Sequence, residues 1–127
     1  MKKHILFEGP FPLSKAIIHD AAYTMEISGQ IGLNLDTGEL EVGIEKQTEA
    51  TMNIIKKILE DEGWNMDNIV KARIFLKDMK DYEKMNDIYA SFFNSTYPTR
   101  FALAVKELPR NALVEIECTA VGDSINN

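Results

Sequence analysis

Residues 69–93, IVKARIFLKDMKDYEKMNDIYASFF, decide the fold class because the spacing of their apolar residues changes within one short stretch. Over residues 69–78 apolar and polar side chains alternate, which predicts a strand. One face of this strand would carry Val70, Ala72, Ile74 and Leu76. After Asp78 the apolar residues recur every three or four positions, which predicts an amphipathic helix that stops before Pro98. Its apolar stripe would contain Tyr82, Met85, Ile88, Tyr89, Phe92 and Phe93.

The segments on either side complete an alternation of strands and helices. Residues 21–32 alternate and predict a strand that ends at Gly29, whereas residues 44–62 have the spacing of an amphipathic helix. Two further strands are predicted near residues 100–107 and 113–121. Strands, a helix, a strand, a helix and two strands, in this order, suit an α+β fold in which two helices pack on one face of a mixed sheet.

The last two predicted strands each sort their side chains onto two faces. In RFALAVKEL, small and basic residues alternate with Phe101, Leu103 and Val105, which we expect to belong to the core. In LVEIECTAV, Glu115 and Glu117 alternate with apolar residues. Because two helices cover only one face of a sheet, the other face would lack a cover from its own chain. We expect several copies to associate through it.

An arginine at the first position of an otherwise apolar strand indicates a site for a small anion. Arg100 stands beside small alanines, which leave room before a guanidinium whose planar fork binds a carboxylate through two hydrogen bonds. Glu115 could then hold a water molecule or share a proton. Alternatively, Arg100 pairs with a glutamate across the sheet, and Glu115 and Glu117 belong to a solvated strand face. The spacing alone leaves both readings open.

Composition and charge argue against several classes of function. With 45% hydrophobic residues and no linker or internal repeat, the chain of 127 residues predicts one domain over residues 1–127. A net charge of -6 without a Lys/Arg-rich block argues against a nucleic-acid partner. His4 and His19 are isolated and Cys118 is the lone cysteine, so we expect no metal site and a thiol in the core. The opening MKKHILFEG has no apolar targeting run, so we expect a cytoplasmic protein without a membrane partner.

Three short motifs near the C-terminus together resemble the signature of the YjgF/RidA family. They are Pro98-x-Arg100, then Leu108-Pro109, then Val114-Glu115-Ile116-Glu117. The resemblance continues through ISGQIGLNLDTGEL, QTEATMNIIKKILEDEG, the stretch at 69–93 and CTAVG, so it covers nearly the whole chain. The family is also known by the names L-PSP endoribonuclease and translation initiation inhibitor.

This resemblance implies a chorismate-mutase-like fold of the bacillary type, assembled as a homotrimer. The sheets would form a central barrel with one cleft at each subunit boundary. Family members that carry the arginine hydrolyse reactive enamine and imine acids, such as 2-aminoacrylate and 2-aminocrotonate, to 2-keto acids and ammonia, and they need no cofactor. The expected partners are therefore other copies of the chain and a small carboxylate-bearing imine or keto acid.

The resemblance also implies roles for individual residues. Arg100 would bind the substrate carboxylate, and Glu115 would place the attacking water. Ser28, Gly29 and Asn86 would help to line the cleft. From the residues alone, however, Ser28 and Gly29 could simply end a strand, and Asn86 could be an exposed helix residue.

Two positions depart from the family pattern. Leu13, in PLSKAI, occupies the position at which the family commonly has a tyrosine. Ala102 occupies a substrate-binding position at which the family's archetypes carry a cysteine. Alternation predicts that Cys118 lies on the opposite face of the next strand, so we do not expect it to replace that thiol. These departures make a non-catalytic trimeric sensor of small carboxylates, such as 2-keto acids, an alternative function. Ribonuclease or translation-inhibiting activity ranks lower, because the chain is acidic and has no paired histidines.

Overall fold

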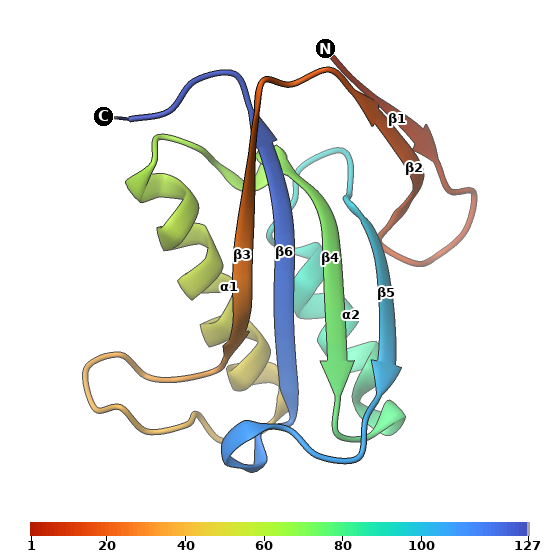
Figure 1. Ribbon diagram of the computed structural model, residues 1–127. Coiled ribbons are helices and arrows are strands. Elements are labelled where there is room, and N and C mark those ends of the chain that lie inside the picture. The colour runs from red at the N-terminus through yellow and green to blue at the C-terminus, as the bar shows by residue number, and fades with distance from the viewer. Residues whose placement is uncertain (127) are drawn as a thin grey trace.

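The computed structural model describes residues 1–126 and contains a mixed four-stranded sheet (Figure 1). Its strands, in order across the sheet, are β3 (Tyr23–Ile31), β6 (Val114–Gly122), β4 (Ile69–Leu76) and β5 (Thr99–Ala104). Strand β6 runs antiparallel to both β3 and β4, whereas β4 and β5 are parallel. Strands β3 and β5 are therefore the two edges of this sheet.

Two helices cover one face of the sheet and leave the other face open, as the sequence predicts (Figure 1). Helix α1 (Ile44–Asp61) buries an apolar stripe that includes Met52, Ile55 and Leu59. It ends shortly before Gly63, whose φ of 78° is one that glycine adopts without strain.

Helix α2 (Tyr82–Ala90) is shorter than the predicted helix at both ends. A short 3₁₀ turn, η2 (Met79–Asp81), precedes it, and the side chain of Asp78 caps that turn by accepting a hydrogen bond from the Lys80 N–H at 2.9 Å. Tyr82 is consequently the first residue of the regular helix and lies close to the edge of the sheet.

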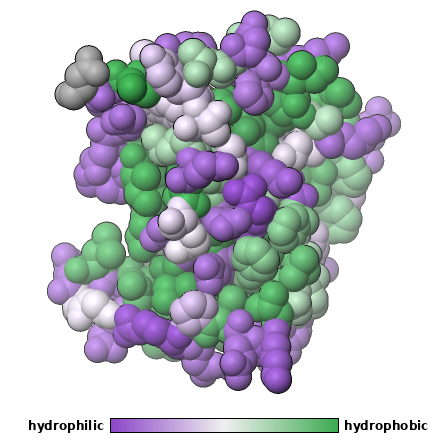
Figure 2. Space-filling model, in the orientation of Figure 1, coloured by the Kyte–Doolittle hydropathy of each residue, from purple (hydrophilic) through white to green (hydrophobic). Residues whose placement is uncertain are grey.

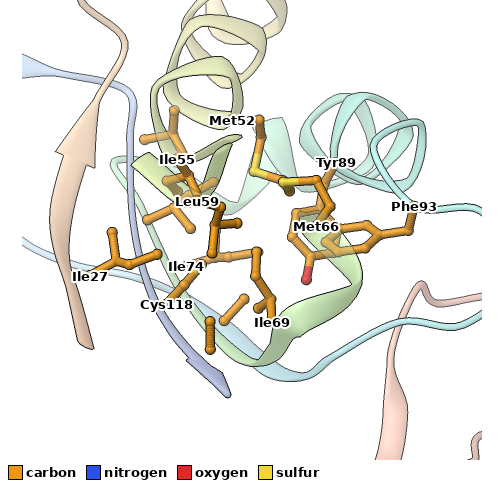
Figure 3. Packing of buried hydrophobic residues seen from close by; sticks show 14 of the residues in the cluster. Ile27, Met52, Ile55, Leu59, Met66, Ile69, Ile74, Tyr89, Phe93 and Cys118 are labelled. Carbon is orange, nitrogen blue, oxygen red and sulfur yellow. The ribbon is translucent and has the colours of Figure 1, made fainter. Parts of the chain in front are cut away.

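The core lies between the two helices and the covered face of the sheet (Figure 3). Alternate residues of the central strands point into it, and Ile74 of β4 and Ile116 of β6 are fully buried. Cys118 also lies in this core, as predicted. Each such apolar side chain contributes about 1.5–3 kcal/mol when it is buried. The tightly packed central strands therefore fix the positions of the edge strands and their side chains.

An N-terminal hairpin that the sequence pattern does not predict packs beside the β5 edge (Figure 1). Strand β1 (Lys2–Leu6) pairs antiparallel with β2 (Ser14–His19). The buried Ser14 attaches the hairpin, because its backbone N–H donates to the Pro98 carbonyl at 3.0 Å and its hydroxyl donates to the Tyr97 carbonyl at 2.5 Å. Both strands are largely exposed, so they lack the strict alternation that identifies a half-buried strand.

Strand β3 does not end at Gly29, and the prediction of a strand terminator there is wrong. The strand continues to Ile31 past an irregularity in its pairing with β6, between Ile27 and Gln30. A glycine within a strand is typical of such a bulge, which changes the direction of nearby side chains without ending the strand.

The prediction that the apolar side of β5 belongs to the core is also wrong. The exposed fractions of Phe101 and Leu103 are 38% and 42%, and the Phe101 ring packs edge-on against Phe75 on the open face. Helix α2 instead covers the side that carries Arg100 and Ala102. Alternation separates the two sides of a strand, but it does not show which side the helices cover.

The open face is polar near its middle and apolar beside it (Figure 2). Arg73 forms an ion pair with Glu117 there, and it also donates a hydrogen bond to the Thr119 hydroxyl at 3.0 Å. As predicted, no helix of residues 1–126 covers this face (Figure 1).

Candidate functional site

Arg100 lies at the second position of β5, on the face of the sheet that the helices cover. In register, Arg100 lies beside Ala72 of β4, and Ala72 lies beside Cys118 of β6. Both of these neighbours are small and fully buried, so they leave the space above them to longer side chains. The guanidinium extends toward α2, where its Nη2 donates a hydrogen bond to the Tyr82 hydroxyl at 3.1 Å.

Two aromatic rings flank this guanidinium. Arg100 Cζ lies 5.6 Å from the centroid of the Tyr82 ring and 5.2 Å from that of Tyr89, within the range of cation–π attraction. Its Nη1 is buried and has no hydrogen-bond partner within residues 1–126. No carboxylate of that part of the chain forms an ion pair with Arg100. The reading in which Arg100 pairs with a glutamate across the sheet is therefore wrong, since Glu117 pairs with Arg73 instead.

Asn86 and Ala102 lie on the same side as Arg100. Asn86 stands on α2 between Tyr82 and Tyr89, at helical positions that share one face. It is buried, contrary to the reading of an exposed helix residue, and its Oδ1 has no hydrogen-bond partner within the described residues. Ala102 follows two residues after Arg100 on β5 and is half-buried. We refer to Tyr82, Asn86, Tyr89, Arg100 and Ala102 as the arginine cluster.

Cys118 lies on the same face of the sheet as this cluster, so the prediction that it faces the opposite way from Ala102 is wrong. Ala102 is in register with Ile74 and Ile116, which face the helices as Cys118 does. Burial raises the pKa of Cys118 to about 12 and also raises the pKa of Tyr89. Neither group is therefore an anionic nucleophile near neutral pH. The charge of this cluster comes from Arg100.

A second group, which we call the glutamate cluster, consists of Ser28, Gly29 and Glu115. Glu115 of β6 is half-buried and lies opposite Ile31 of β3. A Cβ atom at position 29 would come within 2.0 Å of Glu115 Oε2, so the carboxylate lies against the Gly29 backbone. Ser28 is exposed beside it. A carboxylate at this place can accept a proton or orient a water molecule.

The structure does not bring the two clusters together within one chain. Glu115 is in register with Phe75 and Leu103 on the open face, whereas Arg100 points toward the helices. The glutamate cluster also lies near the β3 edge, while Arg100 is on the β5 edge. A site that used both clusters would have to be shared between two chains.

The two tyrosines around Arg100 were assigned only a packing role by sequence reasoning. Tyr82, Asn86 and Tyr89 recur at intervals of four and three residues, and this spacing marks a helix face that also has to meet the start of β5.

A cavity of about 490 Å³, lined by residues such as Lys56, Asp67 and Phe92, lies elsewhere and contains no residue of either cluster.

Comparisons with known proteins identify the family of this chain. The profile of the family described as Endoribonuclease L-PSP matches residues 8–122. The chain belongs to this family. Members of the L-PSP family, which is also called YjgF/RidA, include a protein of Capra hircus named 2-iminobutanoate/2-iminopropanoate deaminase. It is 39% identical over 112 residues, which are 87% of this chain and 80% of the relative.

Two solved structures of L-PSP family proteins are also similar to this chain. RidA from an Antarctic Psychrobacter is 33% identical, with a TM-score of 0.76 over 85% of this chain and 86% of that one. E. coli TdcF with bound serine is 30% identical, with a TM-score of 0.76 over 91% of this chain and 90% of that one. These similarities confirm the resemblance and the α+β fold with two helices and a mixed sheet.

Residues 1–126 also bear on membrane spans and on metal sites. Neither helix of that part of the chain is long and apolar enough to cross a lipid bilayer. The same residues contain no group of three His, Cys, Asp or Glu side chains arranged to hold a metal ion.

Proposed function

We propose that this protein hydrolyses reactive 2-imino acids and their enamine tautomers, such as 2-aminoacrylate and 2-aminocrotonate, to 2-keto acids and ammonia. The observation that carries the proposal is Arg100, whose guanidinium is flanked by two rings and has no carboxylate partner within residues 1–126. A guanidinium without a carboxylate partner favours a small organic anion as its ligand. The Capra hircus relative, which is named a deaminase of this kind, supports the choice of reaction.

The chemistry requires orientation more than a strong nucleophile, because a protonated imine is already electrophilic. Arg100 would hold the substrate carboxylate while Glu115 accepts a proton from a water molecule that adds to the imine carbon. Glu115 would return this proton to the amino group of the carbinolamine. The carbon–nitrogen bond then breaks, the hydroxyl loses its proton as it becomes the carbonyl of the keto acid, and the departing ammonia takes up that proton to leave as ammonium.

The proposed active assembly is a homotrimer with one cleft at each boundary between subunits. Two observations support it: the arginine and glutamate clusters lie on opposite faces of one sheet, and the open face exposes Phe101 and Leu103. Joining the β3 side of one chain to the β5 side of the next would complete the site and cover the apolar part of that face. Sedimentation velocity at micromolar concentration tests this directly, and a monomer there contradicts it.

The deaminase proposal is tested by a trapping assay. A serine dehydratase generates 2-aminoacrylate, semicarbazide traps it, and the purified protein should lower the amount trapped. Arg100→Ala should lose most of this activity, because a charged contact through two hydrogen bonds disappears from a half-buried site. The control Lys106→Ala removes an equal but exposed charge and should keep the parental activity. If Arg100→Ala removes 2-aminoacrylate as fast as the parent, the assignment of Arg100 is wrong.

A second candidate function is binding of small carboxylates without turnover. Leu13, which is half-buried next to the anchored Ser14, and Ala102 supply neither a hydroxyl nor a thiol. Arg100 remains available to an anion, and TdcF was solved with serine, another small carboxylate, bound. Calorimetric binding of 2-oxobutanoate without any fall in trapping would favour this function. RNA cleavage assayed in parallel tests the activity named in the family description, which the net charge of -6 disfavours.

A further inference from the structure

Tyr82 is held against Arg100 from two directions. Its hydroxyl accepts the hydrogen bond from Arg100 Nη2 at 3.1 Å, and Arg100 Cζ lies 5.6 Å from the centroid of its ring. The ring of Phe11, from the segment between β1 and β2, packs edge-on against the Tyr82 ring with 5.8 Å between centroids. The position of the hydroxyl is thus set by α2, by Arg100 and by the N-terminal hairpin together.

The burial of Arg100 restricts the edge through which it can bind an anion. Because Nη1 is buried, the edge formed by Nη1 and Nη2 is closed to a ligand. A carboxylate that binds Arg100 through two hydrogen bonds would therefore use Nε and Nη2. The Tyr82 hydroxyl is hydrogen-bonded to Nη2, so it lies beside an atom that a carboxylate on this edge would also contact.

The direction of the existing hydrogen bond leaves the hydroxyl hydrogen of Tyr82 free. A guanidinium can only donate, so the Tyr82 oxygen is the acceptor and its own O–H still has to find a partner. An oxygen that accepts from a cation is polarised, which makes its O–H a better donor. Within residues 1–126, no other hydroxyl is hydrogen-bonded to Arg100, and Leu13 and Ala102 provide none.

We propose that the Tyr82 hydroxyl donates a hydrogen bond to the carboxylate that Arg100 holds, and that it makes the site selective for carboxylates over neutral analogues. The inference rests on the proposed binding of a carboxylate at Arg100, but it does not depend on turnover. A ligand oxygen would receive hydrogens from Tyr82 and from Arg100. The amide analogue has one oxygen and an NH₂ group. The N–H groups of this NH₂ would face the donors of Tyr82 and Arg100 instead of hydrogen-bond acceptors.

The test compares Tyr82→Phe with Tyr23→Phe. The first variant removes the hydroxyl and keeps the ring that packs on Arg100 and Phe11. The second removes a hydroxyl from an exposed tyrosine at the start of β3 that belongs to neither cluster. Calorimetry gives the Kd for 2-oxobutanoate and for 2-oxobutanamide, and steady-state kinetics with 2-aminocrotonate gives KM and kcat.

Tyr82→Phe should weaken 2-oxobutanoate binding and raise KM by about 10- to 100-fold, the worth of a hydrogen bond to a charged group, while kcat changes less than threefold. Binding of the amide should change little, and Tyr23→Phe should match the parent. Equal Kd and KM values for Tyr82→Phe and the parent overturn the proposal, as does an equal loss for the amide. If the parent binds 2-oxobutanoate through Tyr82 but hydrolyses no imine, the assignment of Tyr82 stands and the deaminase proposal fails. A parent that binds no carboxylate overturns both.

Discussion

The substitution Gly29→Ala tests whether the position of the Glu115 carboxylate supports the activity. The new Cβ would lie 2.0 Å from Glu115 Oε2 and 3.0 Å from its Cδ, so the carboxylate must retreat to a contact distance of about 3.5 Å. Because this is the free end of a flexible side chain, the move costs about 0.5–1.5 kcal/mol. Gly29 does not have a positive φ, so alanine restores about 0.4–1 kcal/mol by restricting the unfolded chain. The free energy of unfolding should change by less than about 1 kcal/mol.

The rate should respond much more strongly than the stability. Displacing a catalytic group by 1 Å or more lowers a rate by about 100-fold, so Gly29→Ala should reduce the removal of 2-aminoacrylate in the trapping assay by that order. Glu115→Gln, which keeps the shape of the side chain but not its charge, should lose activity to a similar degree. A well-folded Gly29→Ala protein that keeps the parental rate would refute the role given to the Glu115 carboxylate.

Gly32→Ala provides the opposite control. A Cβ at position 32 would come within 2.5 Å of the Gln47 carbonyl oxygen and 2.6 Å of its Cα, which are backbone atoms of α1 and cannot turn away. Overpacking of this kind lowers the free energy of unfolding by about 1–3 kcal/mol or more. Urea denaturation should therefore show the large loss of stability for Gly32→Ala and not for Gly29→Ala.

Three further predictions concern stability and assembly. Burial raises the pKa of Cys118 from 9.0 to about 12, so its stabilising effect is complete below pH 9 and declines, by up to about 1.4 kcal/mol per pH unit, as the pH rises toward 12. Urea titrations at about pH 8 and pH 10.5 should show a smaller decline for Cys118→Ala, and equal declines would contradict this. Leu59→Ala should lower the free energy of unfolding by about 2–5 kcal/mol, because the side chain is fully buried, and a loss below 1 kcal/mol would show that the core collapses around it. Phe101→Glu should convert a sedimenting trimer to monomer with unchanged circular dichroism, and a persisting trimer would mean that the open face is not the interface.

The elements of the fold could be predicted because their hydrophobic periods are distinct. Residues 69–93 change from period two to period 3.6, and the structure places β4 and α2 within this stretch. Alternation could not reveal that Phe101 faces away from the helices, since this depends on where α2 crosses the sheet. The β1–β2 hairpin was missed because its strands bury too little to show a pattern.

The two clusters of the candidate site differ in how they could be found from the sequence. Arg100 and Glu115 are polar residues in apolar strands, so each one departs from the local pattern and attracts attention. Tyr82 and Tyr89 follow the helical pattern, and nothing in their spacing distinguishes a ring that packs on the core from one that packs on a guanidinium. Asn86 was found only through the resemblance, because the spacing of one polar residue on a helix does not show that it is buried.

The location of Arg100 at a sheet edge explains how a charged residue on the covered face can serve a ligand. The neighbouring positions in the two central strands are occupied by Ala72 and Cys118, which are completely buried. An unpaired guanidinium at either of these positions would be strongly destabilising. At the edge, the rings of Tyr82 and Tyr89 compensate part of the lost hydration while one side of the fork stays open. A carboxylate on the edge formed by Nε and Nη2 would compensate more of it, so the lack of a carboxylate partner for Arg100 within residues 1–126 is itself a source of affinity for such anions.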